Sequence, residues 1–289
     1  MCATQQFTLA ELAPVADVAP DDLFVILKGY FDGGNEADST QYETVTLASL
    51  FGRTEDWRPF EAAWKVTLNK HEAPYLHTTE AVTLNNDFRV GWTASRRDAF
   101  MGDCVAVLRQ SLVKAVNDDT LEPGIFPCVI TIVLKDFKKA QSIPGSPQDA
   151  TEVLAVQSFY RMIECSQLIK ASFLYLYFDR NEPFRGHISD RLRNKRFTGD
   201  IKKDGFDIER RVAHIGESDM RAVPALQAAD LLAWCVGHQD NIAFEWQKEL
   251  LGIDRIQEWL DYSELSKPIA GLSDLVNNRW KFPRRRRTR

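Results

Sequence analysis

Runs of β-branched and aromatic residues alternate with stretches of helical periodicity along this chain. Residues 126–134 (FPCVITIVL) form a nearly continuous apolar run, which is typical of a strand covered on both faces. Residues 23–31 (LFVILKGYF) are also strand-like in composition, and turn-forming residues (DGGN, 32–35) follow them. Further strands are predicted at residues 42–52, 173–178 and 212–216. We expect the strand at 42–52 to pair with the first strand.

Apolar residues recur at helical spacing between these strands. In residues 54–70, the side chains of Trp57, Phe60 and Trp64 fall on one face of the predicted helix, which assigns them to the core. The hydroxyl and acidic residues at 54–56 suit the start of that helix. Further helices are predicted at residues 94–116, 149–171, 224–241 and 245–260.

This order of elements predicts an α/β fold with a mixed β-sheet flanked by helices. Neither a Gly/Ser-rich or Pro-rich linker nor a repeat of fixed period divides the 289 residues. We therefore expect one domain at residues 23–281 that includes C-terminal helices. Residues 1–22 are interpreted as an N-terminal extension, and residues 282–289 as a basic, disordered tail.

The composition favours a cytoplasmic protein with no membrane segment. The first 22 residues contain acidic side chains and have neither the basic start nor the apolar run of a secretory signal. The apolar runs are shorter than the roughly 18 residues that a membrane helix needs. Five cysteines occur without metal-type spacing and are expected to be reduced and mostly buried: Cys2, Cys104, Cys128, Cys165 and Cys235.

The net charge of −5 conceals an uneven distribution. The last eleven residues carry seven basic side chains and no acidic one, so the rest of the chain has 29 basic against 41 acidic residues. Residues 185–211 hold nine basic and five acidic residues. Both basic segments suit contact with nucleic-acid phosphates. Residues 185–211 are equally typical of a charged connector exposed to solvent, and the C-terminal segment is typical of a disordered tail.

Three aspartates stand out by their positions. Asp32 and Asp179 directly follow predicted strands, where ligand sites of α/β sheets form, although Asp also serves there to start turns. Asp230 lies in LQAADLLAW (226–234), which is apolar on nearly every side. A buried carboxylate without a partner is costly, so Asp230 must reach solvent, a cation or a metal ion.

Three carboxylates brought together repel one another unless a cation neutralises them. Mg²⁺ or Mn²⁺ would do so, because both prefer oxygen ligands and keep coordination places for water and phosphate oxygens. Such a site suits hydrolysis of phosphodiesters. Glycine-rich nucleotide motifs, the serine-hydrolase elbow and the HExxH zinc motif do not occur in the sequence.

Four segments in order, GYFDGGNE (29–36), YLHTTEA (75–81), LYFDRNEPF (176–184) and LQAADLLAW (226–234), resemble the bacterial family known as domain of unknown function 3800. The resemblance covers roughly residues 23 to 240. It implies a ribonuclease H-like fold and metal-dependent nuclease chemistry, with Asp32, Asp179 and Asp230 as metal ligands. The chain departs from the family where Gly33, Gly34 and Asn35 replace the usual Glu and Ser after the first aspartate.

Ribonuclease H-like sites usually include a fourth carboxylate. Glu80 and Glu164 are the candidates that we favour for catalysis, with Glu152 as an alternative and Glu36 possible only if its loop bends back. His77 is a candidate to position the attacking water or to assist the leaving group, and structural hydrogen bonding is its alternative role. Gln227 either orients Asp230 from one helical turn away or forms other hydrogen bonds at the core edge.

The sequence therefore predicts a nuclease that uses Mg²⁺ or Mn²⁺ and acts on DNA or RNA. The main alternative is a catalytically inactive nucleic-acid-binding or protein-interaction module on the same scaffold. The altered turn after Asp32 motivates this alternative. A phosphatase-like hydrolase acting on small phosphoesters is a third possibility.

Overall fold

The computed structural model describes residues 25–34, 43–117, 120–122, 124–143, 148–180, 182–194, 198, 202, 207–253, 255–260 and 265. The strands are β1 (Ile26–Gly34), β2 (Thr44–Arg53), β3 (Lys114–Asn117), β4 (Thr120–Glu122), β5 (Phe126–Val133), β6 (Phe173–Asp179), β7 (Val212–Ser218) and β8 (Ile256–Leu260). The helices are α2 (Thr54–Lys70), α3 (Thr78–Thr83), α4 (Ala94–Ser111), α5 (Leu134–Ala140), α6 (Ala150–Leu168), α7 (Pro183–Arg193), α9 (Ile208–Arg211), α10 (Pro224–Gly237) and α11 (Glu245–Leu251), with 3₁₀ turns η1 (Asn86–Phe88) and η2 (Met220–Ala222).

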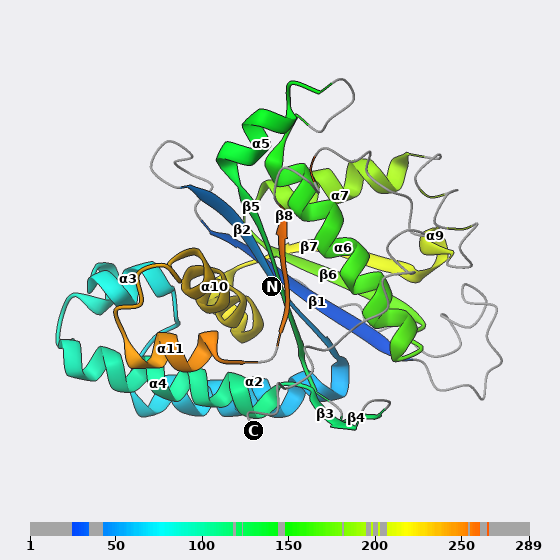
Figure 1. The fold of residues 1–289 in the computed structure, drawn as a ribbon. Helices are drawn as coiled ribbons and strands as arrows, with labels where there is room; N and C mark the ends of the chain where they lie inside the picture. The colour runs from blue at the N-terminus through cyan, green and yellow to red at the C-terminus, as the bar shows by residue number, and fades with distance from the viewer. Residues whose placement is uncertain are drawn as a thin grey trace, which may run out of the picture.

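Six strands form one sheet in the order β7-β6-β1-β2-β5-β8 (Figure 1). Strand β2 runs antiparallel to its neighbours β1 and β5, whereas the other pairings are parallel. Helices cover both faces of this mixed sheet, as the sequence predicts. The arrangement is consistent with a ribonuclease H-like α/β fold. Strands β3 and β4 form a separate antiparallel pair.

Each face of the sheet has its own apolar core and its own helices. Figure 1 shows α6 and α7 on one side of the sheet, and α10, α4 and α11 on the other. A Cβ atom added to Gly29 of β1 would lie 3.0 Å from the Met162 side chain of α6, and one added to Gly34 would lie 3.5 Å from the carbonyl oxygen of Ala233 in α10. Side chains alternate along a strand, so the even-numbered positions of β1 face α10.

Several predicted elements are confirmed. Strand β2 pairs with β1 over eight residue pairs, and β5 is buried along almost its whole length. Helix α2 begins at Thr54, where the Asp56 carboxylate accepts a hydrogen bond from the backbone N–H of Arg53 at 3.0 Å. Trp57, Phe60 and Trp64 are buried, as expected. The acidic start of this helix therefore has the capping role that its sequence predicts.

Two predicted helices end early because the residues that follow them enter strands. The helix predicted at 94–116 ends at Ser111, because Leu112 forms a bridge with Ile125 and the chain enters β3. The helix predicted at 245–260 ends at Leu251, and residues 256–260 form the edge strand β8 beside β5. A short apolar run is compatible with the periodicity of a helix or of a strand. Here pairing with the edge of β5 favours the strand.

The described part of the segment predicted as a turn, residues 32–34, is strand instead. Strand β1 continues to Gly34, with Asp32 paired to Ala48 and Gly34 paired to Thr46 of β2. The antiparallel partner supplies hydrogen-bonding groups that keep these turn-type residues extended. Asp32 therefore lies inside the strand, close to its carboxyl end, rather than after it.

Some predictions fall on residues outside the described part. These are the N-terminal extension at 1–22, the basic tail at 282–289, Asn35, Glu36 and Cys2. The other four cysteines have buried free thiols, as expected: Cys104, Cys128, Cys165 and Cys235. Among the helices of the described residues, none has the length and apolarity that a bilayer crossing requires.

Candidate functional site

Asp32 and Asp179 lie next to each other at the carboxyl ends of two adjacent parallel strands. Phe31 of β1 is in register with Phe178 of β6, so the two aspartates are the next residues of the paired strands. Tyr30 and Tyr177, two residues earlier, stack with ring centroids 5.1 Å apart. Because residues two apart share a face, both aspartates lie on the face that α10 covers. Asp32 is buried and Asp179 is partly exposed.

Helix α10 brings Asp230 to the same face. Its side chains are buried almost throughout, because the helix is packed between the sheet and the helices outside it. The backbone N–H of Thr78 donates a hydrogen bond of 2.6 Å to Oδ2 of Asp230. Burial raises the pKa of Asp230, the nearby His77 and the Thr78 N–H oppose that rise, and the charge of Asp179 adds to it. Asp179 and Asp230 are thus close enough to interact electrostatically.

Glu182 is a fourth carboxylate of this group, and the sequence analysis did not select it. It lies three residues after Asp179 and immediately precedes α7, whose first residue is Pro183. Burial raises the pKa of Glu182 to about 7, with further contributions from the charges of Asp179 and Asp230. Its Oε2 atom is buried and has no hydrogen-bond partner within the described residues. An acid just after a strand-end aspartate and before a helix-starting proline was the available signal in the sequence.

We call Asp32, Asp179, Glu182 and Asp230 the carboxylate cluster. Asp179 is held within it by the backbone N–H of Met220, which donates a hydrogen bond of 2.8 Å to Oδ1. Met220 begins η2, the turn between β7 and α10. Two of the four acids, Asp179 and Asp230, therefore have one oxygen bound by a backbone amide of a neighbouring loop, which fixes their orientation.

His77 lies beside the carboxylate cluster at the start of α3. It is the N-cap residue of that helix, and its Nδ1 atom accepts a long hydrogen bond of 3.5 Å from the backbone N–H of Glu80. In a neutral imidazole with Nδ1 as acceptor, the proton is on Nε2. The influence of His77 on the pKa of Asp230 places the ring near that carboxylate. The structural and the chemical roles predicted for His77 are thus compatible with each other.

The two acids favoured for the fourth position have other partners. Oε2 of Glu80 accepts a hydrogen bond of 2.6 Å from the Tyr75 hydroxyl, and Oε1 accepts one of 2.8 Å from the Asn86 amide. Both oxygens of Glu80 are therefore engaged in holding the segment around α3. This leaves its predicted catalytic role without support from the geometry.

Glu164 lies on the other face of the sheet. It belongs to α6, where it forms an ion pair of 2.6 Å with Arg161, and Arg161 also pairs with Glu258 of β8. Glu152, the alternative in the same helix, pairs with Arg191 at 2.6 Å. Because α6 packs on the face opposite to α10, the structure does not bring either acid to the carboxylate cluster.

Gln227 links the loops that hold the cluster. Its Oε1 accepts hydrogen bonds from the indole N–H of Trp64 at 2.8 Å and from the backbone N–H of Leu76 at 3.0 Å. Its Nε2 donates to the carbonyl oxygen of Met220 at 3.0 Å. Leu76 is two residues before Thr78, and Met220 is the residue whose N–H holds Asp179. Gln227 is therefore a positioning residue for both loops rather than a direct partner of Asp230.

Replacing Gln227 with Met should weaken the fold and misplace the cluster together. The substitution leaves buried donors and an acceptor without their partner, so we expect a loss of about 1–3 kcal/mol in the free energy of unfolding. Denaturant unfolding measures this, with Gln110→Met on the exposed side of α4 as the matched control. Equal stability of the two variants would contradict the role assigned to Gln227.

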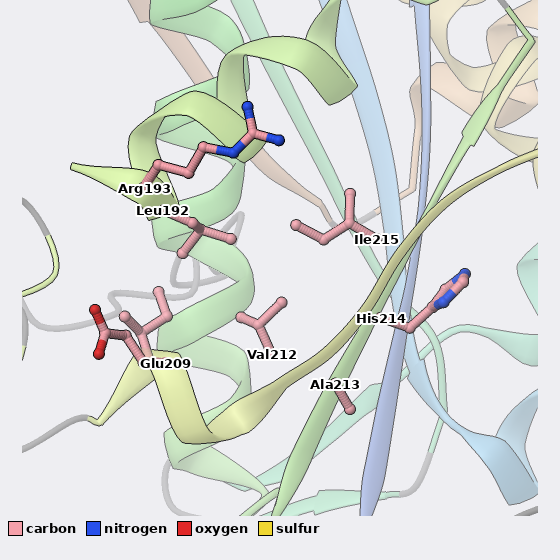
Figure 2. Close-up of a pocket in the computed structure, with 8 residues that line it drawn as sticks. Leu192, Arg193, Glu209, Val212, Ala213, His214 and Ile215 are labelled. Carbon is pink, nitrogen blue, oxygen red and sulfur yellow. The ribbon is translucent and has the colours of Figure 1, made fainter. Parts of the chain in front are cut away.

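A cavity of about 510 Å³ lies away from the cluster, between α7, α9 and β7 (Figure 2). Leu192, Ile208, Val212 and Ile215 give it an apolar lining, with Arg193 and Glu209 at its rim. Basic side chains near it are paired with acids: Arg191 with Glu152, Arg193 with Asp190, and Arg185 with Glu217. In its described part, the basic segment 185–211 thus has many local ion pairs.

Comparison with protein-family models and with curated proteins finds no match for this chain. The resemblance to domain of unknown function 3800 accordingly stays a prediction. Within the residues described, no group of three or more His, Cys, Asp or Glu side chains is arranged so that it could hold a metal ion as it stands. The assignment of Asp32, Asp179 and Asp230 as metal ligands is likewise still a prediction.

Proposed function

We propose that this protein is a divalent-metal-dependent phosphodiesterase that cleaves nucleic acid. The observation that carries the proposal is the crowding of Asp179, Glu182 and Asp230: burial raises the pKa values of Glu182 and Asp230, and the charge of Asp179 raises both further. A fold gains nothing from burying like charges together, and such arrangements are concentrated at functional sites.

The donor set of the carboxylate cluster fits a hard divalent cation. It consists of carboxylate oxygens, which Mg²⁺ and Mn²⁺ prefer, and the buried Oε2 of Glu182 has no competing hydrogen bond within the described residues. Asp32, Asp179, Glu182 and Asp230 would hold the cation. Like charges separate when no cation lies between them, so we expect binding to draw these side chains inward. When bound, Mg²⁺ or Mn²⁺ would activate water and offset charge on a phosphate.

The residues around the cluster prepare it for this chemistry. The N–H groups of Thr78 and Met220 each bind one oxygen of an aspartate, which fixes the orientation of both carboxylates. His77 carries its proton on Nε2 when neutral and is placed beside Asp230. From there its Nε2–H can donate a hydrogen bond that positions the attacking water or the leaving oxygen. Neither the orientation of the aspartates nor the hydrogen bond from His77 uses the side chain of Glu80 or of Glu164.

The test is cleavage of single- and double-stranded DNA and RNA by purified protein with Mg²⁺, with Mn²⁺ and with EDTA. We expect cleavage that requires the metal ion and that is absent from an Asp179→Asn preparation purified in the same way. That variant also controls for contaminating nucleases. If no nucleic acid is cut, or if Asp179→Asn cuts equally well, the proposal fails. Binding that survives EDTA without any cleavage would favour the inactive binding module instead.

We also propose that the protein is cytoplasmic. The four buried free thiols of the described residues support this, because unpaired cysteines are usual where the surroundings are reducing. Cell fractionation with an antibody against the chain tests it, and recovery with secreted material would overturn it.

A further inference from the structure

Three aromatic side chains form a strip on one face of β6 and β7. The rings of Tyr175 and His214 stack with centroids 5.9 Å apart, and the rings of Tyr177 and His214 are 5.1 Å apart. On the neighbouring strand β1, the buried Tyr30 stacks with Tyr177, with ring centroids 5.1 Å apart. We call Tyr175, Tyr177 and His214 the aromatic strip. Tyr175 and Tyr177 are partly exposed, and His214 is exposed.

The aromatic strip leads directly to the carboxylate cluster. Tyr175, Tyr177 and Asp179 are alternate residues of β6, so they share a face and follow one another at intervals of about 7 Å. Strand β7 runs parallel beside them, with His214 opposite Tyr175 and Ser218 opposite Asp179. A chain-like ligand lying along these strands would pass over the rings and arrive at Asp179.

Gly216 sets the orientation of the His214 ring. A Cβ atom added to Gly216 would lie 2.3 Å from Nε2 of His214, so the imidazole occupies the space above this glycine. Gly216 is in register with Tyr177. Figure 2 shows the ring on the opposite side of β7 from Leu192, Val212 and Ile215, which line the cavity. The His214 ring thus extends along the strand toward the cluster, on the face that bears the tyrosines.

The charges near the aromatic strip suit a ligand with neutral rings and anionic links. Partial burial lowers the pKa of His214, which favours the neutral imidazole, so the side chain offers a ring face rather than a charge. Lys28 of β1 is in register with Tyr175 at the end of the strip farther from the carboxylates. Arg180, two-thirds exposed, follows Asp179 at the other end and forms an ion pair with Asp219 at 3.3 Å. A basic side chain therefore stands at each end of the strip, and burial lowers the pKa of the one at the far end, Lys28.

We propose that the aromatic strip binds single-stranded nucleic acid by stacking its bases, and so delivers the strand to the carboxylate cluster. This inference rests on the proposed function and names the substrate class. Bases of a duplex are stacked on each other and cannot present their faces, whereas unpaired bases can lie on aromatic side chains. The wild-type protein should therefore prefer single strands to duplexes of the same sequence.

The experiment measures the binding of fluorescent 20-nucleotide probes by anisotropy, with Ca²⁺ in place of Mg²⁺ to limit cleavage. The probes are a single strand, its duplex and an abasic strand of equal length, which keeps the phosphates but has no bases. We expect the single strand to bind roughly tenfold or more tightly than either of the others. This comparison uses only wild-type protein, so it stands even if a variant fails to fold. Equal binding of the normal and abasic strands would overturn the proposal.

Variants then locate the binding surface. His214→Ala and Tyr177→Ala should each weaken single-strand binding roughly tenfold. Gly216→Ala should weaken it as well, because the new methyl group displaces the His214 ring while every ring is retained. The control is Trp259→Ala, which removes an exposed aromatic side chain from β8 at the opposite edge of the sheet. Equal losses in Trp259→Ala and His214→Ala would refute the location.

Failure of this inference differs from failure of the proposed function. If the wild type cleaves nothing with Mg²⁺ or Mn²⁺ but prefers normal to abasic strands, the binding role of the aromatic strip is supported and the nuclease assignment is refuted. If it cleaves nucleic acid in a metal-dependent manner but binds the normal and the abasic strand equally, the nuclease assignment is supported and the binding role of the aromatic strip is refuted.

Discussion

Replacing Asp230 with Asn is expected to lower the rate of metal-dependent cleavage more than about 100-fold while making the metal-free protein more stable. The loss of activity exceeds the 10- to 100-fold that is typical for residues supporting a metal ligand, because Asp230 itself is assigned as a ligand. The two effects have opposite signs, which distinguishes a functional carboxylate from a structural one.

The gain in stability follows from the surroundings of Asp230. Burial and the charge of Asp179 raise its pKa, so its ionised form is disfavoured in the fold. An asparagine keeps an oxygen that can accept the hydrogen bond from the Thr78 N–H, now 2.6 Å long, and removes the charge. We expect the free energy of unfolding to rise on the order of 1 kcal/mol.

Thermal and denaturant unfolding in EDTA measure the stability, and the cleavage assay measures the activity. Asp240→Asn is the matched control, because it makes the same change at an exposed position just after α10. It should alter neither quantity. A fully active Asp230→Asn protein would remove Asp230 from the site, and a large loss of stability would show that its carboxylate supports the fold.

Replacing Glu182 with Gln is expected to remove a pH dependence of stability from the metal-free protein. The pKa of Glu182 is about 7 in the fold, against an ordinary value of 4.5. Between these values the folded protein holds a proton that the unfolded chain releases. The free energy of unfolding therefore falls as the pH rises from about 4.5 to 7, by up to about 3 kcal/mol from this residue alone. Below pH 4.5, Glu182 is protonated in both the folded and the unfolded state, so none of this stability is lost.

Divalent metal ions should restore the stability that the metal-free protein loses when Glu182 ionises. A divalent cation stabilises the ionised cluster, so Mn²⁺ should raise the melting temperature of the wild type more at pH 8 than at pH 5.5. Glu182→Gln should show both a weaker pH dependence in EDTA and a smaller Mn²⁺ effect at pH 8. Glu245→Gln, at an exposed position of α11, is the control and should behave like the wild type. If Glu182→Gln and wild type have parallel profiles in EDTA, the pKa assigned to Glu182 is wrong.

The pattern of the sequence was sufficient to place two of the four acids. Asp32 and Asp179 adjoin apolar, β-branched or aromatic runs, and strands of that kind end where α/β sheets gather polar groups. Asp230 was found by a different signal, since a single acid among apolar residues on every side of a helix needs a reason to be buried. These signals are local, and each is readable without knowing which strands pair.

The fourth acid could not be chosen in this way. Glu164 lies within a predicted helix, Glu182 closely follows a predicted strand, and Glu80 lies between two predicted helices. Sequence spacing does not say which face of the sheet a helix covers. Packing decides this: α6 lies on the face opposite to α10 and carries Glu164 to Arg161, whereas the turn after β6 leaves Glu182 beside Asp179 and Asp230. Both carboxylate oxygens of Glu80 accept hydrogen bonds, one from Tyr75 and one from Asn86.

By itself, then, the sequence determined the α/β class, the strands that bear the aspartates and the buried acid of α10, because hydrophobic periodicity and the cost of buried charge act over short stretches of chain. Only the tertiary structure decided that residues 256–260 add a strand, that Glu182 joins the cluster, that Gln227 holds two loops, and that His214 lies beside Tyr175 and Tyr177. Each of these depends on contacts between segments far apart in sequence, whose pairing is set by the packing of the whole sheet and its helices.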